Sequence, residues 1–411
     1  MSGSDQPDET TSAPDHDGPV VRLKPKADAR AIRHGLPWVY ADDLVLDRRT
    51  RALSPGTIAT LEDSGRQPLA RIAFNPSSRI AARVLDRDPE AQIDAGWMAA
   101  RVRRALALRD TLFDAPFYRL IHAEGDGLPG LIVDRFGVAL SIQPNAAWVD
   151  ARLDLLADAL VAVTGASTVL KNAGGRARAR EGLDDASGVL RGAVNGPVPV
   201  PMNGAIYMAD LLGGQKTGLF YDQRPNHAFV AHLARGGSVL DVFSHVGGFA
   251  LAALAAGATE ALAVDGSEPA LELARVGAHK MGVGDRFHVH RADAFDAMTA
   301  LAENARTFRT VICDPPAFAP SKEALGAGLR AYERVARLAA PLVEAGGTLT
   351  LCSCSHAADL TKFRAACIRG IGRAGREAQV LHTGGAGPDH PQHPELAESG
   401  YLKAIVFRIL T

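Results

Sequence analysis

The stretch that decides the fold is Val239-Leu240-Asp241-Val242-Phe243-Ser244-His245-Val246-Gly247-Gly248-Phe249. It begins with the apolar character of a buried strand, and an apolar, helix-like run to Ala256 follows the glycine pair. Open α/β sheets bind ligands at the carboxyl ends of such strands. Two glycines let a ligand approach the backbone closely there. The stretch therefore predicts the ligand-binding turn of a strand–turn–helix unit.

Strand-like and helix-like segments alternate around this turn. Strands are expected at 238–242, 261–264, 287–290, 310–313, 347–352 and 404–409. Helices are expected between them, for example at 271–281 and 332–342. Such alternation is typical of an open, largely parallel sheet with helices on both faces. The predicted fold class is therefore α/β, with a Rossmann-like sheet over residues 201–411.

The N-terminal part of the chain has a different pattern. Residues 1–18 are acidic and polar and are expected to be disordered. Short β-like runs separated by turns predict a small β-barrel at 19–90. Residues 91–200 predict a connector domain of helices and strands. Its first helix, at 93–112, should expose Arg101, Arg103, Arg104 and Arg109.

The composition restricts the class of protein. The chain has 411 residues, of which 47% are hydrophobic and 22% charged, so it can bury a sizeable core. The longest apolar runs are far shorter than a membrane span. Its four cysteines lack the spacing of a metal site, and we expect no metal. These features indicate a reduced, cytoplasmic protein.

The polar residues around the turn indicate the type of cofactor. Asp241, Phe243, Ser244 and Gly247 are candidate cofactor-binding residues of the turn, and Asp265 ends the next strand, where it could accept both hydroxyls of a ribose. No Gly-x-Gly-x-x-Gly pattern and no P-loop lysine is present, so S-adenosylmethionine fits better than a dinucleotide or a triphosphate. Asp293 is a further acidic residue with two possible roles: it binds the adenine amine, or it caps a helix.

The segment Asp314-Pro315-Pro316 follows the fourth strand. Two prolines stiffen this loop and remove backbone donors. The Asp314 carboxylate can then meet a planar base. Methyltransferases of exocyclic amines have a similar loop with an aromatic residue directly after the second proline, whereas this chain has Ala317. Methylation of an exocyclic amine in RNA or DNA is therefore the weaker alternative.

Cys354 ends the next strand, in Cys352-Ser353-Cys354-Ser355. Carbon 5 of cytosine is a poor nucleophile, but addition of a thiolate at carbon 6 makes it reactive. A cysteine at this position is placed for that addition, and Asp314 could hold the protonated N3 of the ring. We read Cys352, deeper on the same strand, as a packing residue. The other reading of Cys354 is a small buried hydrophobic residue.

Basic residues suggest a nucleic-acid partner although the net charge is only −1. They gather in three clusters: Arg22, Lys24, Lys26, Arg30 and Arg33; Arg176, Arg178 and Arg180; and Arg364, Arg369, Arg373 and Arg376. Each cluster could be solvated surface. Three together modestly favour a phosphate-binding face.

The chain resembles a known family, the PUA-domain-containing 23S ribosomal RNA 5-methylcytosine methyltransferases. The most specific matching segments are Gly125-Asp126-Gly127-Leu128-Pro129-Gly130 and Lys216-Thr217-Gly218-Leu219-Phe220-Tyr221-Asp222-Gln223-Arg224. Further matches are the segment 243–249, Asp314-Pro315-Pro316, Ser353-Cys354-Ser355 and Gly400-Tyr401-Leu402-Lys403. The match covers nearly all of the chain after the acidic tail.

The resemblance implies a PUA domain that binds RNA, a connector, and a class I methyltransferase domain. It implies that Phe220, Asp222 and Gln223 help enclose S-adenosylmethionine and that Cys354 is the nucleophile. The expected partner is RNA, with 23S ribosomal RNA favoured, and a homodimer is one arrangement consistent with the sequence. A noncatalytic RNA-binding assembly factor is the alternative from another class, and the cofactor-site residues argue against it.

Overall fold

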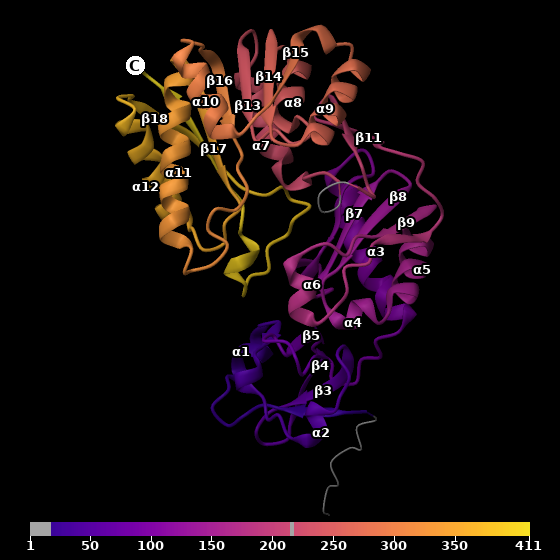
Figure 1. The fold of residues 1–411 in the computed structure, drawn as a ribbon. Coiled ribbons are helices and arrows are strands. Elements are labelled where there is room, and N and C mark those ends of the chain that lie inside the picture. The colour runs from indigo at the N-terminus through magenta and orange to yellow at the C-terminus, as the bar shows by residue number, and fades with distance from the viewer. Residues whose placement is uncertain (1–17, 214–217) are drawn as a thin grey trace, which may run out of the picture.

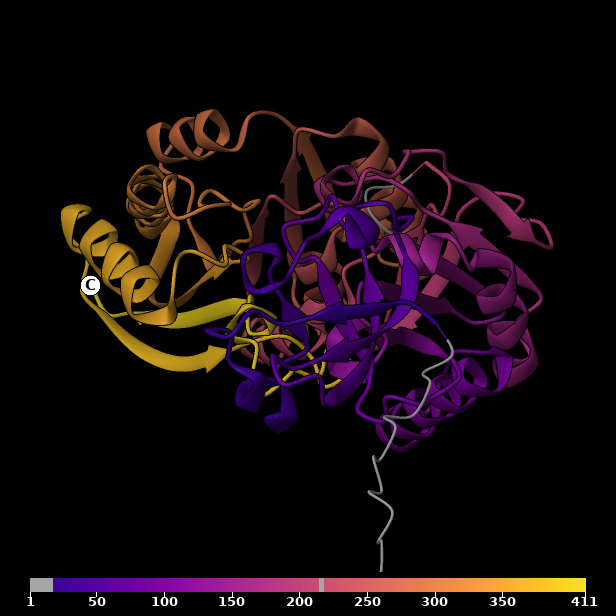
Figure 2. The same cartoon turned by 90° about the horizontal axis from the view of Figure 1, so that it is seen from below.

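The computed structural model describes residues 18–213 and 218–411 and contains three large sheets, which follow one another along the chain (Figure 1). The predicted acidic tail lies outside the described residues except for Gly18, as do Lys216 and Thr217. Figure 1 shows the sheets stacked from the N-terminal one at the bottom to the C-terminal one at the top. In the view from below (Figure 2), the N-terminal unit lies in front of the centre, and the C-terminal helices lie to one side.

The first sheet has five strands in the order β1-β3-β4-β5-β2. Their bounds are β1 Val20–Arg22, β2 Trp38–Val39, β3 Thr57–Glu62, β4 Pro68–Phe74 and β5 Ala82–Asp86, and two short helices, α1 (Ala29–His34) and α2 (Arg48–Arg51), accompany them. The sheet encloses its own apolar core, in which Leu61, Ile72 and Phe74 are fully buried. The short β-like runs expected from the sequence within 19–90 are therefore present as strands in this unit.

The second sheet has the order β10-β9-β8-β7-β6, and only β8 and β9 run parallel. Its strands are β6 Phe117–His122, β7 Leu131–Phe136, β8 Ala139–Pro144, β9 Thr168–Lys171 and β10 Gly188–Arg191. Its helices are α3 Ala95–Leu112, α4 Ala147–Asp150, α5 Leu153–Thr164 and α6 Arg176–Glu181. Residues of α3 and α5 share one apolar cluster with the strands.

The prediction that α3 exposes Arg109 is wrong. The Arg109 side chain is fully buried, on the same helix face as Met98, Val102 and Ala105. Its guanidinium donates two hydrogen bonds to Asp126, of 2.7 and 2.8 Å. The helical spacing alone would have placed Arg109 on the buried face, but its partner comes from another element. Arg178 is likewise buried, in contact with Asp150 and Asp184, so it does not contribute to an exposed basic face.

The third sheet has seven strands in the order β15-β14-β13-β16-β17-β19-β18. Their bounds are β13 Ser238–Val242, β14 Glu260–Asp265, β15 Phe287–Arg291, β16 Phe308–Cys313, β17 Val343–Ser353, β18 Ala378–Gly384 and β19 Lys403–Ile409. The first five run parallel, and β19 is antiparallel to both β17 and β18. The open, largely parallel sheet is confirmed; β18, whose side chains are mostly exposed, was not expected.

Helices cover both faces of this sheet. On one face lie α7 Arg224–Leu233, α8 Gly248–Ala255 and α9 Glu268–Lys280; on the other lie α10 Ala294–Glu303, α11 Leu325–Ala339 and α12 Leu360–Arg373. Successive residues of β13 alternate between the two cores, with Val239 in one and Leu240 in the other. This explains why the strands read as continuous apolar runs.

A hairpin that was not expected from the sequence precedes the third sheet. Its strands are β11 Val198–Met202 and β12 Ala205–Ala209. Val200 and Tyr207 are fully buried in the same apolar cluster as α8 and α9. The predicted domain limit between residues 200 and 201 therefore falls within β11. None of the described helices is both long and apolar enough to cross a membrane.

Candidate functional site

The turn after β13 has an unusual backbone conformation. Phe243, His245 and Gly247 have φ angles of 64°, 50° and 77°. Positive φ is uncommon for residues other than glycine, and such conformations gather at functional loops. A Cβ atom on Gly248 would lie 2.8 Å from Nε2 of His227, so only glycine fits where α8 begins. The turn is thus a tightly packed backbone structure at the start of α8.

Asp241 lies beneath this turn. Its side chain is 1% exposed, and Oδ2 accepts a hydrogen bond of 2.9 Å from the amide of Ala250. Burial raises the pKa of Asp241 to about 7, and the charges of Asp314 and Asp265 act in the same direction. Asp241 therefore holds the N-terminal turn of α8 against the end of β13.

Asp265 ends β14 and braces the turn from the side. Its Oδ2 accepts from the amide of His245 and its Oδ1 from the amide of Ser267, both at 2.8 Å. Each carboxylate oxygen has two acceptor sites, so both retain capacity for a ligand hydroxyl. The structure thus places Asp265, the residue expected to bind the ribose, directly beside the turn.

Asp293 is the N-cap of α10. Its Oδ1 accepts from the amides of Phe295 and Asp296, at 2.8 and 3.2 Å. The helix-capping reading of Asp293 is therefore correct. The side chain is exposed, and binding of an adenine amine by its other oxygen stays a prediction.

The turn formed by residues 220–223 connects the turn after β13 with the loop after β16. The Phe220 ring packs edge-on against His245, with 5.1 Å between ring centroids. Asp222 is 8% exposed, and its Oδ2 accepts from the hydroxyl of Tyr401 at 2.5 Å. Gln223 Nε2 donates to Oδ2 of Asp314 at 2.9 Å. One short segment therefore contacts the turn after β13, the loop after β16 and the C-terminal region.

Three polar atoms around this turn suit a polar ligand. Oδ1 of Asp222, Oδ1 of Asp241 and Oγ of Ser244 are buried and have no hydrogen-bond partner within residues 18–213 and 218–411. Buried polar atoms without partners are rare in folded proteins, because each costs free energy. The carboxylates also match the positive charge of S-adenosylmethionine. The residues present therefore fit this cofactor.

Cys354 follows β17 and is the only one of the four cysteines that is not fully buried. Cys352 is 1% exposed, and burial raises the pKa of its thiol well above the ordinary value, with the nearby Asp314 carboxylate adding to the effect. Burial also raises the pKa of Cys313 and of Cys367. Cys354 is therefore the cysteine best placed to react.

The serines on either side of Cys354 hold it in place. Ser353 Oγ donates to the hydroxyl of Tyr332 at 2.9 Å, and Tyr332 shares a second hydrogen bond, of 2.7 Å, with Ser355 Oγ. Lys403 Nζ donates to the carbonyls of Ser355 and Ala358, at 2.7 and 2.8 Å. The sequence predicted no role for Tyr332, Lys403 or Tyr401. The only signal was that Tyr401 and Lys403 lie in the segment 400–403, which matches the related family.

Asp314 lies at the same sheet edge as Cys354. Cys313 is in register with Leu351 of β17, which places Asp314 level with Cys352 and two residues before Cys354. The Asp314 amide donates to the carbonyl of Val242. The following aromatic residue, Phe318, packs among Phe243, Phe295 and Tyr332. The strand order thus brings the candidate catalytic pair to one edge of the sheet.

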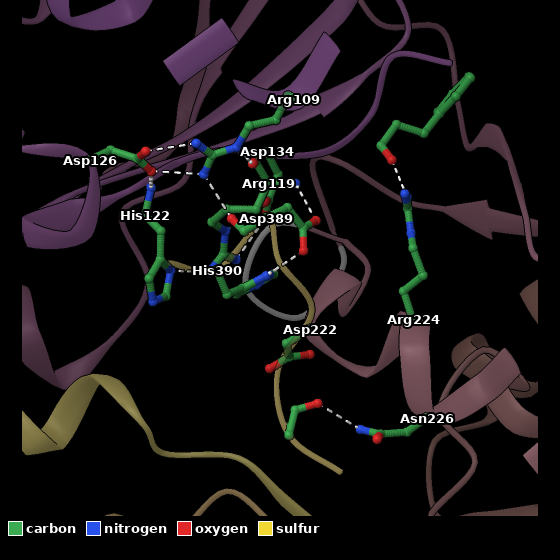
Figure 3. Close-up of polar contacts among 12 residues, drawn as sticks. Arg109, Arg119, His122, Asp126, Asp134, Asp222, Arg224, Asn226, Asp389 and His390 are labelled. Carbon is green, nitrogen blue, oxygen red and sulfur yellow. Dashed lines mark hydrogen bonds and ion pairs between the residues drawn. The ribbon is translucent and has the colours of Figure 1, made fainter. Parts of the chain in front are cut away.

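The segment between β18 and β19 ties this edge to the second sheet (Figure 3). Asp389 is fully buried: its carbonyl accepts from Arg109 and its Oδ2 from the amide of Arg119, at 2.8 and 3.0 Å. Its Oδ1 contacts His390 Nδ1 at 2.9 Å. Arg119 also forms two hydrogen bonds with Asp134, as Figure 3 shows. This network anchors the segment between β18 and β19. The same segment contains Tyr401, whose hydroxyl donates to Asp222.

His390 and His393, between β18 and β19, do not belong to a metal centre in the described part of the chain. No group of three or more His, Cys, Asp or Glu side chains there could hold a metal ion. His390 instead packs against His122, with 4.9 Å between ring centroids.

Comparisons with known proteins agree with this architecture. Residues 150–408 match the family described as S-adenosylmethionine-dependent methyltransferase, and residues 21–87 match a PUA-like domain. Proteins named ribosomal RNA large subunit methyltransferase I are similar over nearly the whole chain. That from Shewanella denitrificans is 32% identical, covering 95% of this chain and 99% of its own length; that from Photobacterium profundum is 33% identical, covering 92% and 96%.

Two solved structures share the fold. A SAM-dependent methyltransferase from Streptococcus mutans superimposes with a TM-score of 0.80 at 17% identity, covering 95% of this chain and 100% of that one. A methyltransferase solved in complex with SAH also gives 0.80, at 18% identity, covering 95% and 99%. The chain therefore belongs to the family of S-adenosylmethionine-dependent methyltransferases that carry an N-terminal PUA-like domain, and S-adenosylmethionine is its cofactor.

Proposed function

We propose that this protein methylates carbon 5 of a cytosine in large-subunit ribosomal RNA, 23S RNA in bacteria, with Cys354 as the nucleophile. The observation that carries the proposal is the position of Cys354, half-buried beyond β17 at the sheet edge that also holds Asp314 and Asp265. The names of the relatives supply the substrate class.

In this proposal the cofactor is held by residues of the turn after β13 and of the segment 220–223. Asp265 binds the ribose hydroxyls, and Asp222, Asp241, Phe243, Ser244 and Gly247 line the site, with Phe220 and Gln223 enclosing it. Asp293 binds the adenine amine with the carboxylate oxygen that does not cap α10. When bound, S-adenosylmethionine supplies an electrophilic methyl group on a sulfonium.

The chain's own residues then act on the base. The Cys354 thiolate forms a bond to carbon 6 of cytosine, and the electron pair of the C5–C6 double bond moves onto the ring. N3 takes a proton from solvent as the electron pair moves toward it, and Asp314 accepts a hydrogen bond from this N3–H; the proton returns to solvent when the adduct breaks down. Carbon 5 uses the electron pair to bond the methyl group, and the electrons of the broken methyl–sulfur bond stay on the sulfur, which would become a neutral thioether. Loss of the carbon-5 proton to a base then restores the double bond, and the thiolate leaves carbon 6.

The environment of Phe318 supports this reaction over amine methylation. An amine-methylating site needs an aromatic ring directly after the second proline, where this chain has Ala317. Phe318 itself packs 5.1 Å from the Tyr332 ring and between two other phenylalanines, so its ring belongs to an aromatic cluster.

The PUA-like domain is proposed to bind the RNA. The side chains of Lys24, Lys26 and Arg30 are exposed on it. Arg22 and Arg33 pair with Glu62 and Asp63, and both keep a third or more of their side-chain surface exposed. Such residues can contact phosphates, and RNA binding should then weaken as salt concentration rises.

The direct test is a methylation assay with purified protein and 23S RNA from cells that lack the corresponding gene. Mass spectrometry of the digested nucleosides should detect 5-methylcytidine. Cys352→Ala serves as the matched control and should keep most of the activity, because its thiol takes no part. Detection of N4-methylcytidine instead, or methylation of another base, would contradict the proposal.

A further inference from the structure

Lys403 is a buried ammonium whose hydrogen bonds go to neutral groups. It is the first residue of β19, and it is 7% exposed. Its two acceptors are the carbonyl oxygens of Ser355 and Ala358. A buried charge is costly unless an opposite charge lies nearby. The position of Lys403 therefore calls for an anionic neighbour.

The ammonium of Lys403 lies at the end of β17, directly after which Cys354 follows. Lys403 is paired with Ser353 across the antiparallel strands, and its Nζ reaches the carbonyl of Ser355. Cys354 lies between these two residues along the chain, so the ammonium lies close to the backbone that carries the cysteine. The ammonium and the thiol are close enough for a Coulombic interaction that raises the pKa of Lys403, and Cys354 is the one of the four cysteines that is not fully buried.

The other charged groups nearby are less suited to be that neighbour. Asp359, the exposed N-cap of α12, pairs with Lys362 at 2.5 Å. Tyr332, on α11, is hydrogen-bonded to both serines, and burial raises its pKa. Burial lowers the pKa of Lys403, whereas Cys354 and Asp359 raise it. The pattern matches a cation that becomes favourable when Cys354 is ionised.

We propose that Lys403 is the charge partner of the Cys354 thiolate and keeps the nucleophile ionised and in position. This inference rests on the proposed function, because only a nucleophilic cysteine needs to be ionised. It assigns to a residue of β19 the activation of the cysteine that follows β17. Lys403 is a positioning residue here, since it acts through Cys354 and not on the base.

The test measures the alkylation of Cys354 and needs neither RNA nor cofactor. The full-length protein is treated with iodoacetamide between pH 5.5 and 9.5, and the modified Cys354 peptide is quantified by mass spectrometry. Lys403→Gln removes the charge but keeps an amide donor for the two carbonyls. Lys403→Arg keeps the charge. Cys354→Ala gives the background from the other cysteines.

With the charge removed, the alkylation rate of Lys403→Gln at pH 7 should fall about tenfold, and the pH profile should move upward with the same plateau. Lys403→Arg should stay within about threefold of the wild type, since it carries the same charge. A Lys403→Gln profile that superimposes on the wild type, or a lower plateau without a pH shift, would overturn the proposal. If Lys403→Gln does not fold, Lys403→Arg provides the test. A folded Lys403→Arg protein that is alkylated much more slowly than the wild type at pH 7 would overturn the proposal.

The same variants separate this inference from the proposed function. In the methylation assay, Lys403→Gln should lose activity at pH 7 and regain part of it at pH 9. If the alkylation profile shifts as expected while Cys354→Ala still methylates RNA, the charge pair is real and the proposed nucleophile is wrong. If the profile does not shift but Cys354→Ala is inactive, the proposed function stands and the role of Lys403 fails.

Discussion

The site has a cofactor half, formed by the turn after β13 and residues 220–223, and an acceptor half, formed by the sheet edge with Cys354 and the segment between β18 and β19. The two halves are built in different ways. In the cofactor half, the turn after β13 is held by Asp241 and Asp265 through hydrogen bonds that span 9 and 20 residues of chain. In the acceptor half, Arg109 reaches Asp389 across 280 residues, and Tyr401 ties this half to Asp222 of the cofactor half across 179. Local contacts can be recognised in a sequence, whereas pairs this far apart appear only when the chain is folded.

The largest expected effect concerns the long-range contacts. Arg109→Leu leaves the buried Asp126 without its guanidinium partner, and it also removes the hydrogen bond to Asp389. Breaking a buried pair in this way costs about 3–5 kcal/mol of unfolding free energy. Urea denaturation should show this loss, provided the variant still folds.

Arg103→Leu is the matched control, because Arg103 is exposed on the same helix. It should change the unfolding free energy by no more than about 0.5 kcal/mol. Equal stability of the two variants would remove the Arg109 network from the account of how the acceptor half is anchored.

A second prediction tests the cofactor half by pH. Burial raises the pKa of Asp241 to about 7, above its value of about 3.9 in the unfolded chain. The folded protein therefore binds the extra proton between these values, so this contribution to stability is complete below about pH 4 and is lost as the pH rises through 7. Relative to Asp241→Asn, the wild type should lose up to about 1.4 kcal/mol per pH unit between pH 5 and 7. Parallel stability curves for the two proteins would show that Asp241 stays ionised when folded.

A third prediction concerns affinity. Asp265→Ala should weaken S-adenosylmethionine binding by about 1.5–3 kcal/mol, because a charge-assisted contact to the ribose is lost. Isothermal titration calorimetry measures this directly. Asp293→Ser keeps a helix-capping side chain, so any smaller loss of affinity there reports the adenine contact without a loss of the cap. Unchanged affinity in Asp265→Ala would restrict Asp265 to bracing the turn.

The contrast also explains what the sequence could predict. The strands of the third sheet other than β18, the turn at 243–248 and the position of Asp265 follow from apolar runs and short spacings, and the structure contains all of them. The capping role of Asp293 is equally local. These features depend on neighbours within one or two elements.

What the sequence did not predict depends on distant partners. Arg109 was expected on an exposed face because it is charged, and the partner that allows its burial, Asp126, lies beyond the helix. A lysine at position 403 shows no recognisable pattern in the sequence. Its position becomes informative only because its ammonium donates to the carbonyls of Ser355 and Ala358, which follow β17. The hairpin β11–β12 was missed because two prolines, Pro199 and Pro201, obscure its strand pattern.

The central claim is that Cys354 forms a bond to the base, and covalent trapping tests it most directly. RNA that carries 5-fluorocytidine at the target position should trap the enzyme in the presence of S-adenosylmethionine, because fluorine on carbon 5 blocks the proton loss that releases the cysteine. The account predicts a denaturation-resistant complex with the wild type and Cys352→Ala, and none with Cys354→Ala, which should still bind the cofactor. A complex that forms with folded Cys354→Ala but not with Cys352→Ala would contradict the account.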